Sequence, residues 1–147
     1  MIVSAVGNIF NAPAEVLVNP VNCVGVMGRG LAFQFKKKFP GNFDMYSVAC
    51  KRGELTPGKV YTVQERGKFI VNFPTKDHWK DPSRLEWIET GLDSLIDEIC
   101  NLELKTVAIP ALGCGLGGLD WYEEVRPLII SKFEEYPEIK VYLYEPE

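Results

Sequence analysis

The sequence predicts a three-layer α/β/α sandwich around a mixed, largely parallel central sheet. Two observations support this prediction: short runs of β-branched residues alternate with segments of helical periodicity, and two of those runs end in glycine-rich loops that lead into helices. The chain has 147 residues, 46% of them apolar, and no internal repeat or linker divides it. This length and composition suit one continuous core. We therefore expect one domain over residues 1–147.

The first part of the chain predicts two strands and two helices. Ile2–Val6 and Val16–Asn19 are short and rich in β-branched residues, as strands are. Gly30–Phe39 and the stretch around Phe43–Lys51 have helical character. The dipeptide Pro40-Gly41 is expected to separate the two helices, because both residue types interrupt regular structure.

A hairpin and the most regular helix follow. Val60–Gln64 alternates in polarity and Phe69–Phe73 is more continuously apolar, and a four-residue loop would join them. A helix is expected over Arg84–Cys100, where Ser83 and Glu86 have the spacing of a capping box. The apolar residues of this helix recur on one face, at Leu85, Ile88, Leu92, Leu95, Ile96 and Ile99. We expect that face to cover the sheet.

The C-terminal part supplies one more helix between two strands. Thr106–Ile109 and Val141–Tyr144 are predicted strands. Between them, Val125, Leu128, Ile129 and Phe133 recur at helical spacing. Pro127 must lie in the first turn of that helix, because a proline further inside would break it. In a sheet of this kind, ligands bind beyond the carboxyl ends of the strands.

Charge and cysteine content exclude several classes of function. With 16 basic and 20 acidic residues the formal net charge is −4, so a nucleic acid would have to be held locally rather than by long-range attraction. No export signal or membrane-length apolar run is present, which favours a cytoplasmic protein with no membrane contact. The widely spaced cysteines and the single histidine, His78, predict free thiols and no metal site.

Two glycine-rich loops, Gly25–Gly30 and Gly113–Gly118, follow predicted strands and precede helices. Glycines let consecutive N–H groups converge on an anion at a helix N-terminus, so two such loops suit a diphosphate. Tight turns are the structural alternative for either loop alone. The second loop also satisfies G-x-G-x-x-G, but a Rossmann loop belongs to the first βαβ unit, and here only one helix and one strand follow.

Four strings occur in a characteristic order: GNIF at 7–10, VNPVNC at 18–23, NFPTK at 72–76 and IPALGCGLG at 109–117. Together with the first glycine loop, this set resembles the signature of macrodomains, and the likeness extends from Ile2 to Tyr144. Within that family it is strongest to the macrodomains of DarG-type antitoxins, which carry the NFPTK string. The resemblance implies an α/β/α macrodomain fold for the whole chain.

The resemblance also implies an enzymatic activity. DarG-type macrodomains hydrolyse the N-glycosidic link between ADP-ribose and a modified thymidine base in single-stranded DNA, reversing the action of a toxin. The implied partners are ADP-ribose, ADP-ribosylated single-stranded DNA and a cognate DNA ADP-ribosyltransferase toxin, with no cofactor and no metal. Three alternatives stay open: a non-catalytic ADP-ribose reader, a glycohydrolase acting on ADP-ribosylated protein, and an enzyme that deacetylates O-acetyl-ADP-ribose.

Site residues follow from the resemblance by position in the matched strings. Lys76 is the implied catalytic residue, at the end of a buried strand, where a desolvated amine could act as nucleophile or base. The residues implied to contact ADP-ribose are Asn8, Ile9, Asn22, Gly28, Arg29, Gly30, Leu31, Thr75, Ala111, Gly113, Cys114, Gly115, Leu116 and Gly117. Adenine would lie against the first two, the distal ribose against Asn22 and the diphosphate against the glycine loops.

Several of these roles have a structural alternative. Asn22 could instead satisfy backbone groups at a strand end. Cys114 is expected to contribute only its backbone, because no histidine lies in its motif and small buried thiols are common. Beside Lys76, the candidates for touching the attached base or strand are His78, Trp79, Lys80 and Arg84.

Two positions depart from the patterns of the family. Many macrodomains hold the adenine amino group with an aspartate where this chain has Asn8, whose amide carbonyl is a weaker acceptor. The terminal ADP-ribose glycohydrolases, which free acidic protein side chains, carry a lysine corresponding to Lys76 and an aspartate where this chain has Gly117. Their lysine–aspartate pair is therefore incomplete here.

Overall fold

Six strands form one sheet in the computed structural model, which describes residues 1–146. Their order is β1-β6-β5-β2-β4-β3, and all neighbours are parallel except the antiparallel pair β3–β4. The sheet is therefore mixed and largely parallel, as predicted. The strands are β1 (Ile2–Ala5), β2 (Val16–Val21), β3 (Tyr61–Glu65), β4 (Lys68–Pro74), β5 (Thr106–Ile109) and β6 (Lys140–Tyr144).

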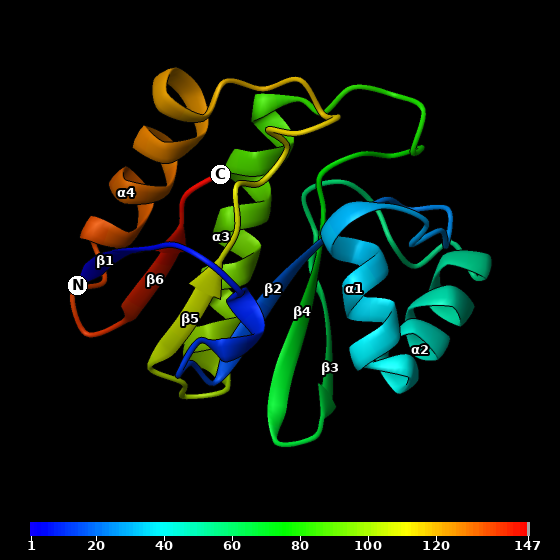
Figure 1. The fold of residues 1–147 in the computed structure, drawn as a ribbon, viewed down its shortest axis with the longest axis horizontal. Coiled ribbons are helices and arrows are strands. Elements are labelled where there is room, and N and C mark those ends of the chain that lie inside the picture. Colours follow the sequence, from blue (N-terminus) through cyan, green and yellow to red (C-terminus); the bar gives the residue numbers. More distant parts are fainter. Residues whose placement is uncertain (147) are drawn as a thin grey trace.

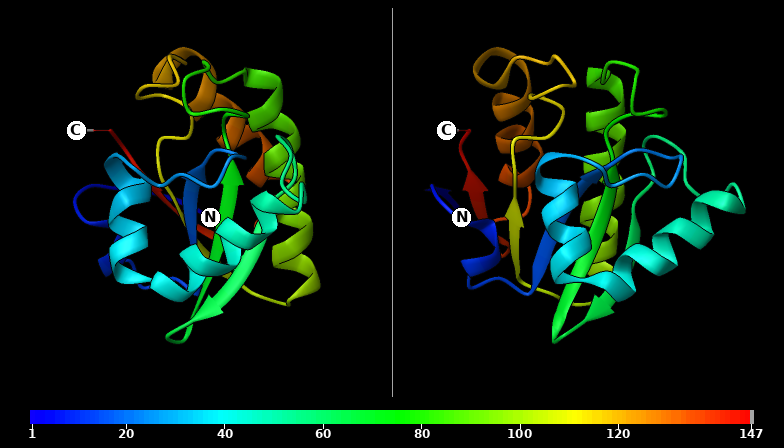
Figure 2. Two further views of the ribbon diagram at one scale, coloured as in Figure 1. Left: turned by 90° about the vertical axis from the view of Figure 1, so that its right-hand side faces the viewer. Right: turned by 45° about the vertical axis from the view of Figure 1, so that its right-hand side comes forward.

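Four helices cover the two faces of this sheet (Figures 1 and 2). They are α1 (Gly30–Lys38), α2 (Pro40–Lys51), α3 (Leu85–Asn101) and α4 (Arg126–Glu134). Two short helical turns, η1 (Ile9–Asn11) and η2 (Trp121–Val125), precede β2 and α4. The pair α1 and α2 lies on one face and the pair α3 and α4 on the other. None of the helices within residues 1–146 is both long and apolar enough to cross a membrane.

Alternate residues of the central strands point to opposite faces and divide the core into layers. Leu17 of β2 and Ile70 of β4 pack in one cluster with Phe35 of α1. Their neighbours Val18 and Val71 belong to the cluster formed with α3 and α4. This alternation explains why consecutive residues of both strands are apolar, and it confirms the predicted α/β/α layering.

Turn chemistry sets several element boundaries. Only Arg66 and Gly67 separate β3 from β4, with φ angles of 51° and 76°, so the predicted four-residue loop is too long. A two-residue turn with both φ angles positive matches the twist of a hairpin, which is why the flanking residues remain paired. Pro40 begins α2, and Pro127 lies in the first turn of α4, where a missing N–H breaks no helical bond.

The start of α3 differs from the prediction. The helix begins at Leu85, with Arg84 as an N-cap that makes no side-chain hydrogen bond. The backbone N–H of Ser83 donates to the carbonyl oxygen of Gly117 at 3.0 Å, and this contact holds Ser83 outside the helix. Within the described residues, the buried hydroxyl of Ser83 has no partner. The predicted capping box of Ser83 and Glu86 is therefore wrong.

The sheet opens between β2 and β5 toward the carboxyl ends of the two strands. Their pairing covers only Val16 and Leu17 of β2, although β2 continues to Val21. The carbonyl of Val21 accepts from the N–H of Thr75 on the β4 side. Because successive backbone groups alternate in direction, the nitrogen of Pro20 faces the side where β5 has separated. A proline is tolerated in this central strand because no ladder bond is lost there.

Three buried asparagines connect β2, β4 and α2. Asn19, Asn42 and Asn72 are all fully buried. Oδ1 of Asn72 accepts from Nδ2 of Asn19 and from Nδ2 of Asn42, both at 3.1 Å. Nδ2 of Asn72 donates to Oδ1 of Asn42 at 2.8 Å and to the backbone carbonyl of Tyr61 at 3.0 Å. Buried amides require such partners, because an unsatisfied one is costly in a medium of low polarity. We call this group the asparagine network.

We expect Asn72→Ala to lower the free energy of unfolding by about 2–4 kcal/mol, because it leaves the amides of Asn19 and Asn42 buried without their shared partner. Urea denaturation followed by circular dichroism measures this change. Gln64→Ala, on the exposed side of β3, is the control, with an expected effect below about 0.5 kcal/mol. Equal loss of stability in both variants would contradict a structural role for the network.

Candidate functional site

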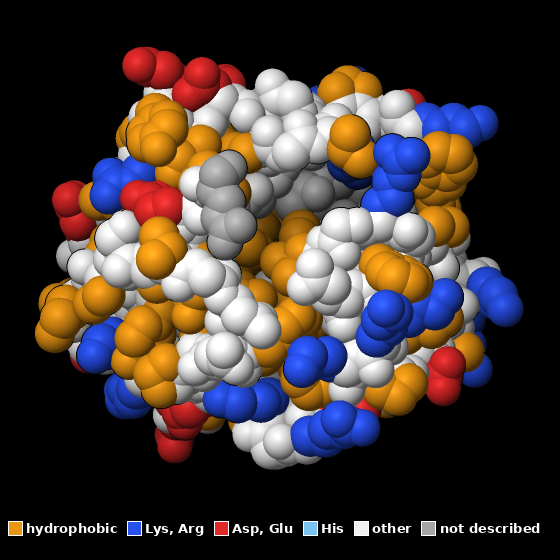
Figure 3. All heavy atoms as spheres, viewed as in Figure 1, with side chains coloured by type: hydrophobic (Ala, Val, Ile, Leu, Met, Phe, Trp, Pro, Cys, Tyr) orange, Lys and Arg blue, Asp and Glu red, His pale blue; other side chains and the backbone are white. Residues whose placement is uncertain are grey.

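The carboxyl ends of the five parallel strands β1, β6, β5, β2 and β4 point to one edge of the sheet (Figure 1). β5 leads through α4 to β6, whereas β2 leads through α1 and α2 to β3, so the two connections run in opposite directions across the sheet. A point of this kind is where ligands bind in open α/β sheets. Figure 3 shows a hollow there with mainly hydrophobic walls, between the loop after β5 and the start of α1.

The loop between β2 and α1 is held in place by Asn22. Its Oδ1 accepts from the N–H groups of Val24 and Val26 at 3.1 and 3.3 Å, and its Nδ2 donates to the carbonyl of Val26 at 2.8 Å. The hydroxyl of Tyr46 in α2 also donates to Oδ1, at 2.8 Å. Burial raises the pKa of Tyr46, which keeps this hydroxyl protonated as a donor.

These bonds give Asn22 the structural role that was the alternative in the sequence. Its side-chain oxygen Oδ1 already accepts three hydrogen bonds, and one N–H of its Nδ2 is already donated. The second N–H of Nδ2 is the group left to meet a ribose hydroxyl. The predicted ribose contact of Asn22 therefore stays a prediction. Its side chain first fixes the path of the loop.

The N-terminus of α1 presents backbone donors to this hollow. The first helical bond runs from the N–H of Phe33 to the carbonyl of Arg29, and Arg29 makes no capping bond with its side chain. The N–H groups of Gly30, Leu31 and Ala32 precede that bond, and no acceptor within residues 1–146 takes them up. The positive end of the helix dipole adds to their attraction for an anion. The predicted phosphate loop, Gly28–Leu31, leads into this helix start.

A second set of backbone donors follows β5. The loop is closed by bonds from Cys114 N to Ala111 O, from Gly118 N to Gly115 O and from Leu119 N to Gly113 O, at 3.3, 3.2 and 3.0 Å. In the part of the chain that the structure describes, the N–H groups of Gly115, Leu116 and Gly117 have no acceptor. Consecutive free N–H groups of this kind form an anion-binding concavity. Gly113 adopts a φ of 72°, a conformation that favours glycine.

The geometry explains why residue 117 is a glycine. A Cβ atom at Gly117 would lie 2.4 Å from the carbonyl oxygen of Gly113 and 2.4 Å from Oγ of Ser83. Since backbone cannot move aside as a side-chain tip can, no aspartate fits here without a shift of the loop. The missing carboxylate therefore follows from how the loop packs against Ser83. A Cβ at Gly115, by contrast, would meet no atom within 4 Å.

Cys114 is a thiol and contributes its backbone to the loop. Burial, followed by the charges of Asp120 and Glu124, raises its pKa to about 11. Its Sγ lies 3.4 Å from the carbonyl oxygen of Leu112. Cysteine nucleophiles typically have a lowered pKa, so this shift gives no support to a nucleophilic Cys114, and its backbone-only role stays a prediction. All four cysteines are free thiols.

The segment predicted to meet adenine lies on the same side of the sheet as α1. The side-chain Oδ1 of Asn8 accepts from the N–H of Phe10 at 2.9 Å and caps η1. An adenine amino group would share this oxygen with Phe10. The side chain of Ile9 is buried, and a ligand contact at Ile9 would come from its backbone. Leu31 and Tyr144 are half-buried against the cluster that contains Ile9. Tyr144 was not among the predicted residues, because no motif contains it.

Lys76 lies where β4 ends beside β2. Pairing of the two strands continues beyond the sheet, through bonds from Thr75 N to Val21 O at 2.9 Å and from Cys23 N to Asp77 O at 2.8 Å. Lys76 lies between these two bonds, which fix its backbone. Its half-buried side chain donates from Nζ to the carbonyl of Trp79 at 3.3 Å. The predicted catalytic lysine is therefore held at the same edge as the two phosphate loops.

The loop after Lys76 carries the aromatic and basic side chains predicted to meet a base. The rings of His78 and Trp79 lie 5.3 Å apart, and Nζ of Lys80 lies 5.1 Å from the ring of Trp79. Trp79 is 49% exposed, so its ring is accessible to a base, and the predicted contact stays a prediction. No group of three or more His, Cys, Asp or Glu side chains in residues 1–146 is arranged to hold a metal ion.

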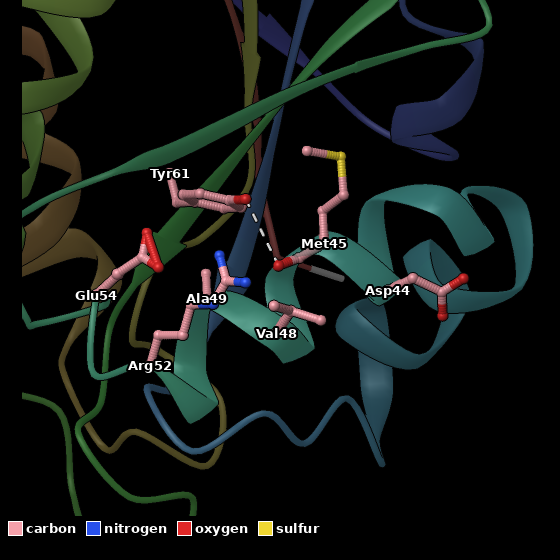
Figure 4. A pocket seen from close by; sticks show the side chains of 7 residues that line it. All are labelled: Asp44, Met45, Val48, Ala49, Arg52, Glu54 and Tyr61. Carbon is pink, nitrogen blue, oxygen red and sulfur yellow. Dashed lines mark hydrogen bonds between the residues drawn. The ribbon is translucent and has the colours of Figure 1, made fainter.

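A separate cavity of about 290 Å³ lies between α2 and β3, away from all predicted site residues (Figure 4). Met45 and Val48 of α2 line it, and the hydroxyl of Tyr61 donates to the carbonyl of Met45 at 3.5 Å across it. Its walls offer no set of backbone donors comparable with those of the two glycine loops. The predicted site residues therefore lie apart from this cavity, at the carboxyl edge of the sheet.

Comparison with known proteins places the chain in a well-defined group. A family model described as "Macro domain" matches residues 18–128. The chain is 47% identical over 150 residues to a Mycobacterium tuberculosis protein named "DNA ADP-ribosyl glycohydrolase", covering 99% of this chain and 42% of that protein. The chain thus spans less than half the length of this relative.

Two solved structures share the fold. The macrodomain of Mycobacterium tuberculosis DarG superposes with a TM-score of 0.96 at 48% identity, covering 100% of this chain and 99% of the other. Thermosipho africanus DarTG in complex with ADP-ribose superposes with a TM-score of 0.88 at 36% identity, covering 97% of this chain and 41% of the other. The observed fold therefore matches that of the DarG macrodomain.

We expect Gly117→Ala to lower the free energy of unfolding by about 2 kcal/mol, since its Cβ would overlap backbone and force the loop to move. Gly115→Ala is the matched control, because its Cβ points into open space and should change stability by less than about 0.5 kcal/mol. Thermal unfolding of both variants measures the difference. If the two alanines were tolerated equally, the packing described for the second loop would be wrong.

Proposed function

We propose, since this chain belongs to the macrodomain family, that it binds ADP-ribose in the hollow at the carboxyl edge of the sheet. We propose further that it hydrolyses the N-glycosidic bond joining ADP-ribose to a thymidine base in single-stranded DNA. Residues 1–147 would act as one macrodomain for this purpose. The relative named as a DNA ADP-ribosyl glycohydrolase supports the activity, and the similar DarTG structure in complex with ADP-ribose supports the binding. The site geometry supplies a physical route to both.

The single observation that carries the binding proposal is the pair of donor sets that flank the opening between β2 and β5. One set is the start of α1, and the other is the run of free N–H groups from Gly115 to Gly117. A diphosphate has two charged groups and can engage both sets at once. Backbone donors cost no side-chain ordering, so the site is prepared for the anion before binding.

Once the diphosphate is bound between the two donor sets, the adenine and the distal ribose extend from it to opposite sides. Adenine would lie toward Asn8, Ile9 and the half-buried Tyr144, and the distal ribose would lie toward Asn22 and Lys76. Thr75, Ala111 and Gly113 would shape the backbone around the sugar and the phosphates. These assignments place the anomeric carbon near the lysine and the thymine base near the loop that contains Trp79.

Lys76 is the residue we assign to the chemistry, in one of two ways. As a nucleophile, its neutral amine bonds to the anomeric carbon while the bond to thymine breaks, and thymine leaves with the electron pair and takes up a proton. Ring opening then gives an imine, which water hydrolyses to ADP-ribose. As a base, Lys76 removes a proton from water, and the oxygen of that water bonds to the anomeric carbon as the bond to thymine breaks. Thymine leaves with the electron pair and takes up the proton held by the lysine, and no covalent adduct forms.

A partner protein and a cellular location are part of the same proposal. A Thermosipho africanus relative is named as a fusion of a DNA ADP-ribosyl transferase with a DNA ADP-ribosyl glycohydrolase. We propose that a transferase of this type makes the substrate of the present chain. Since the proposed substrate is intracellular DNA, the proposed location is the cytoplasm.

A second candidate function is that of a reader, which binds ADP-ribose without turning it over. One observation favours it: the second loop has no room for the carboxylate with which the terminal glycohydrolases complete their lysine–aspartate pair. The two functions make different predictions for Lys76, because a reader needs no group that acts on the anomeric carbon.

We expect Lys76→Ala to reduce single-turnover release of ADP-ribose from a modified thymidine oligonucleotide by at least about 100-fold, the usual contribution of a catalytic acid, base or nucleophile. Affinity for ADP-ribose should change by less than about tenfold, because the diphosphate is bound elsewhere. Lys105→Ala, at the opposite edge of the sheet, is the control. Borohydride added during turnover should trap an adduct on the parent protein only if Lys76 is the nucleophile.

Release at the parental rate by Lys76→Ala would remove the catalytic role of this lysine. Absence of release by the parent protein, together with tight binding of ADP-ribose, would instead favour the reader. One set of measurements therefore distinguishes a wrong catalytic residue from a wrong function.

A further inference from the structure

We propose that a cavity beside Lys76 binds the base of a nucleotide next to the modified thymidine, and that it favours bases with an exocyclic amino group. The cavity has a volume of about 350 Å³, enough for one nucleobase, and is lined by Asp77, Asp81, Pro82, Arg84 and Trp87. We call it the neighbour-base pocket. This inference rests on the proposed action on DNA and adds a sequence preference to it.

The neighbour-base pocket is anchored to both phosphate loops. Its first lining residue, Asp77, accepts with its carbonyl from the N–H of Cys23 in the loop after β2, at 2.8 Å. Ser83, between Pro82 and Arg84, donates with its N–H to the carbonyl of Gly117 in the loop after β5, at 3.0 Å. The pocket therefore occupies a fixed position relative to a bound diphosphate.

The same segment is connected to the reacting end of the ligand. Nζ of Lys76 donates to the carbonyl of Trp79, within the loop that forms the pocket. A thymidine whose ribosyl bond lies near Lys76 would thus have its neighbours in the strand next to this loop. An adjacent base in a single strand is free to turn into such a pocket, because no complementary strand holds it.

Two planar groups in the pocket are suited to a base. Trp87 lies in the first turn of α3 and is half-buried, and the guanidinium of Arg84 lies 5.1 Å from the centre of its ring. Indole rings and guanidinium planes both stack on nucleobases in single-stranded nucleic acid. Stacking explains binding of a base but does not distinguish one base from another.

The carboxylates of the pocket would distinguish bases that carry an amino group from thymine. Asp77 and Asp81 are exposed, and carboxylates only accept hydrogen bonds when ionised. Adenine, cytosine and guanine each offer an exocyclic amino group, whereas thymine offers carbonyl oxygens and one ring N–H. The two carboxylates also repel phosphate, so the base rather than the backbone would enter. Lys80, which does not line the pocket, is left as a positive charge for a phosphate outside it.

Binding of unmodified single-stranded hexanucleotides tests the pocket without any turnover. At low salt, oligo(dA) and oligo(dC) should bind about tenfold more tightly than oligo(dT), the discrimination expected of a hydrogen-bonded base edge. Asp81→Ala should remove most of this difference, and any gain in binding from loss of the negative charge should be equal for the three oligonucleotides. Equal affinity of the parent protein for the three oligonucleotides would overturn the proposal, whether or not the protein hydrolyses ADP-ribosylated DNA.

Trp87 provides a second, independent test. Trp87→Ala should weaken oligo(dC) binding by about tenfold through loss of stacking, and Trp87→Phe should restore most of it. Tyr136→Ala, which removes a half-buried aromatic side chain at the opposite edge of the sheet, controls for a general loss of stability. Unchanged oligo(dC) binding in a folded Trp87→Ala protein, or an equal loss in Tyr136→Ala, would overturn the proposal.

Discussion

The asparagine network is the interaction on which the site depends. Asn19, Asn42 and Asn72 carry amides with no exposure to solvent, and both Asn19 and Asn42 need Asn72 as a partner. This need fixes α2 against β2 and β4. The same helix carries Tyr46, whose hydroxyl bonds to Asn22 and so positions the loop that leads into α1. A shift of α2 would therefore displace the first set of phosphate donors.

The opening between β2 and β5 gives this rigid frame room for the proposed ligand. Parallel strands that remain paired to their ends leave no room between their loops, whereas β2 and β5 pair at only two positions of β2. Pro20 suits the unpaired side of β2 because it has no N–H to leave unsatisfied. The free N–H groups at Gly30 and Gly115 then lie on opposite sides of the opening, where a single diphosphate would satisfy both.

Local sequence patterns predicted the layers of the fold, the two glycine-rich loops after β2 and β5, and the position of Lys76 at a strand end. These features depend on periodicity and on glycine placement, which are visible within a few residues. The start of α3 could not be predicted this way, because Ser83 is held out of the helix by a bond to Gly117, 34 positions further along the chain. The asparagine network depends on strand register, and the structural role of Asn22 depends on Tyr46, so neither leaves a local signal.

The central claim is that backbone N–H groups on both sides of the opening bind the diphosphate of ADP-ribose. Amide chemical shifts during a titration with ADP-ribose test it most directly. The account predicts that the largest changes occur at Gly30, Leu31 and Ala32 and at Gly115, Leu116 and Gly117, and that these two groups respond in parallel with one dissociation constant. Changes confined to one group, or centred on the cavity between α2 and β3, would contradict it.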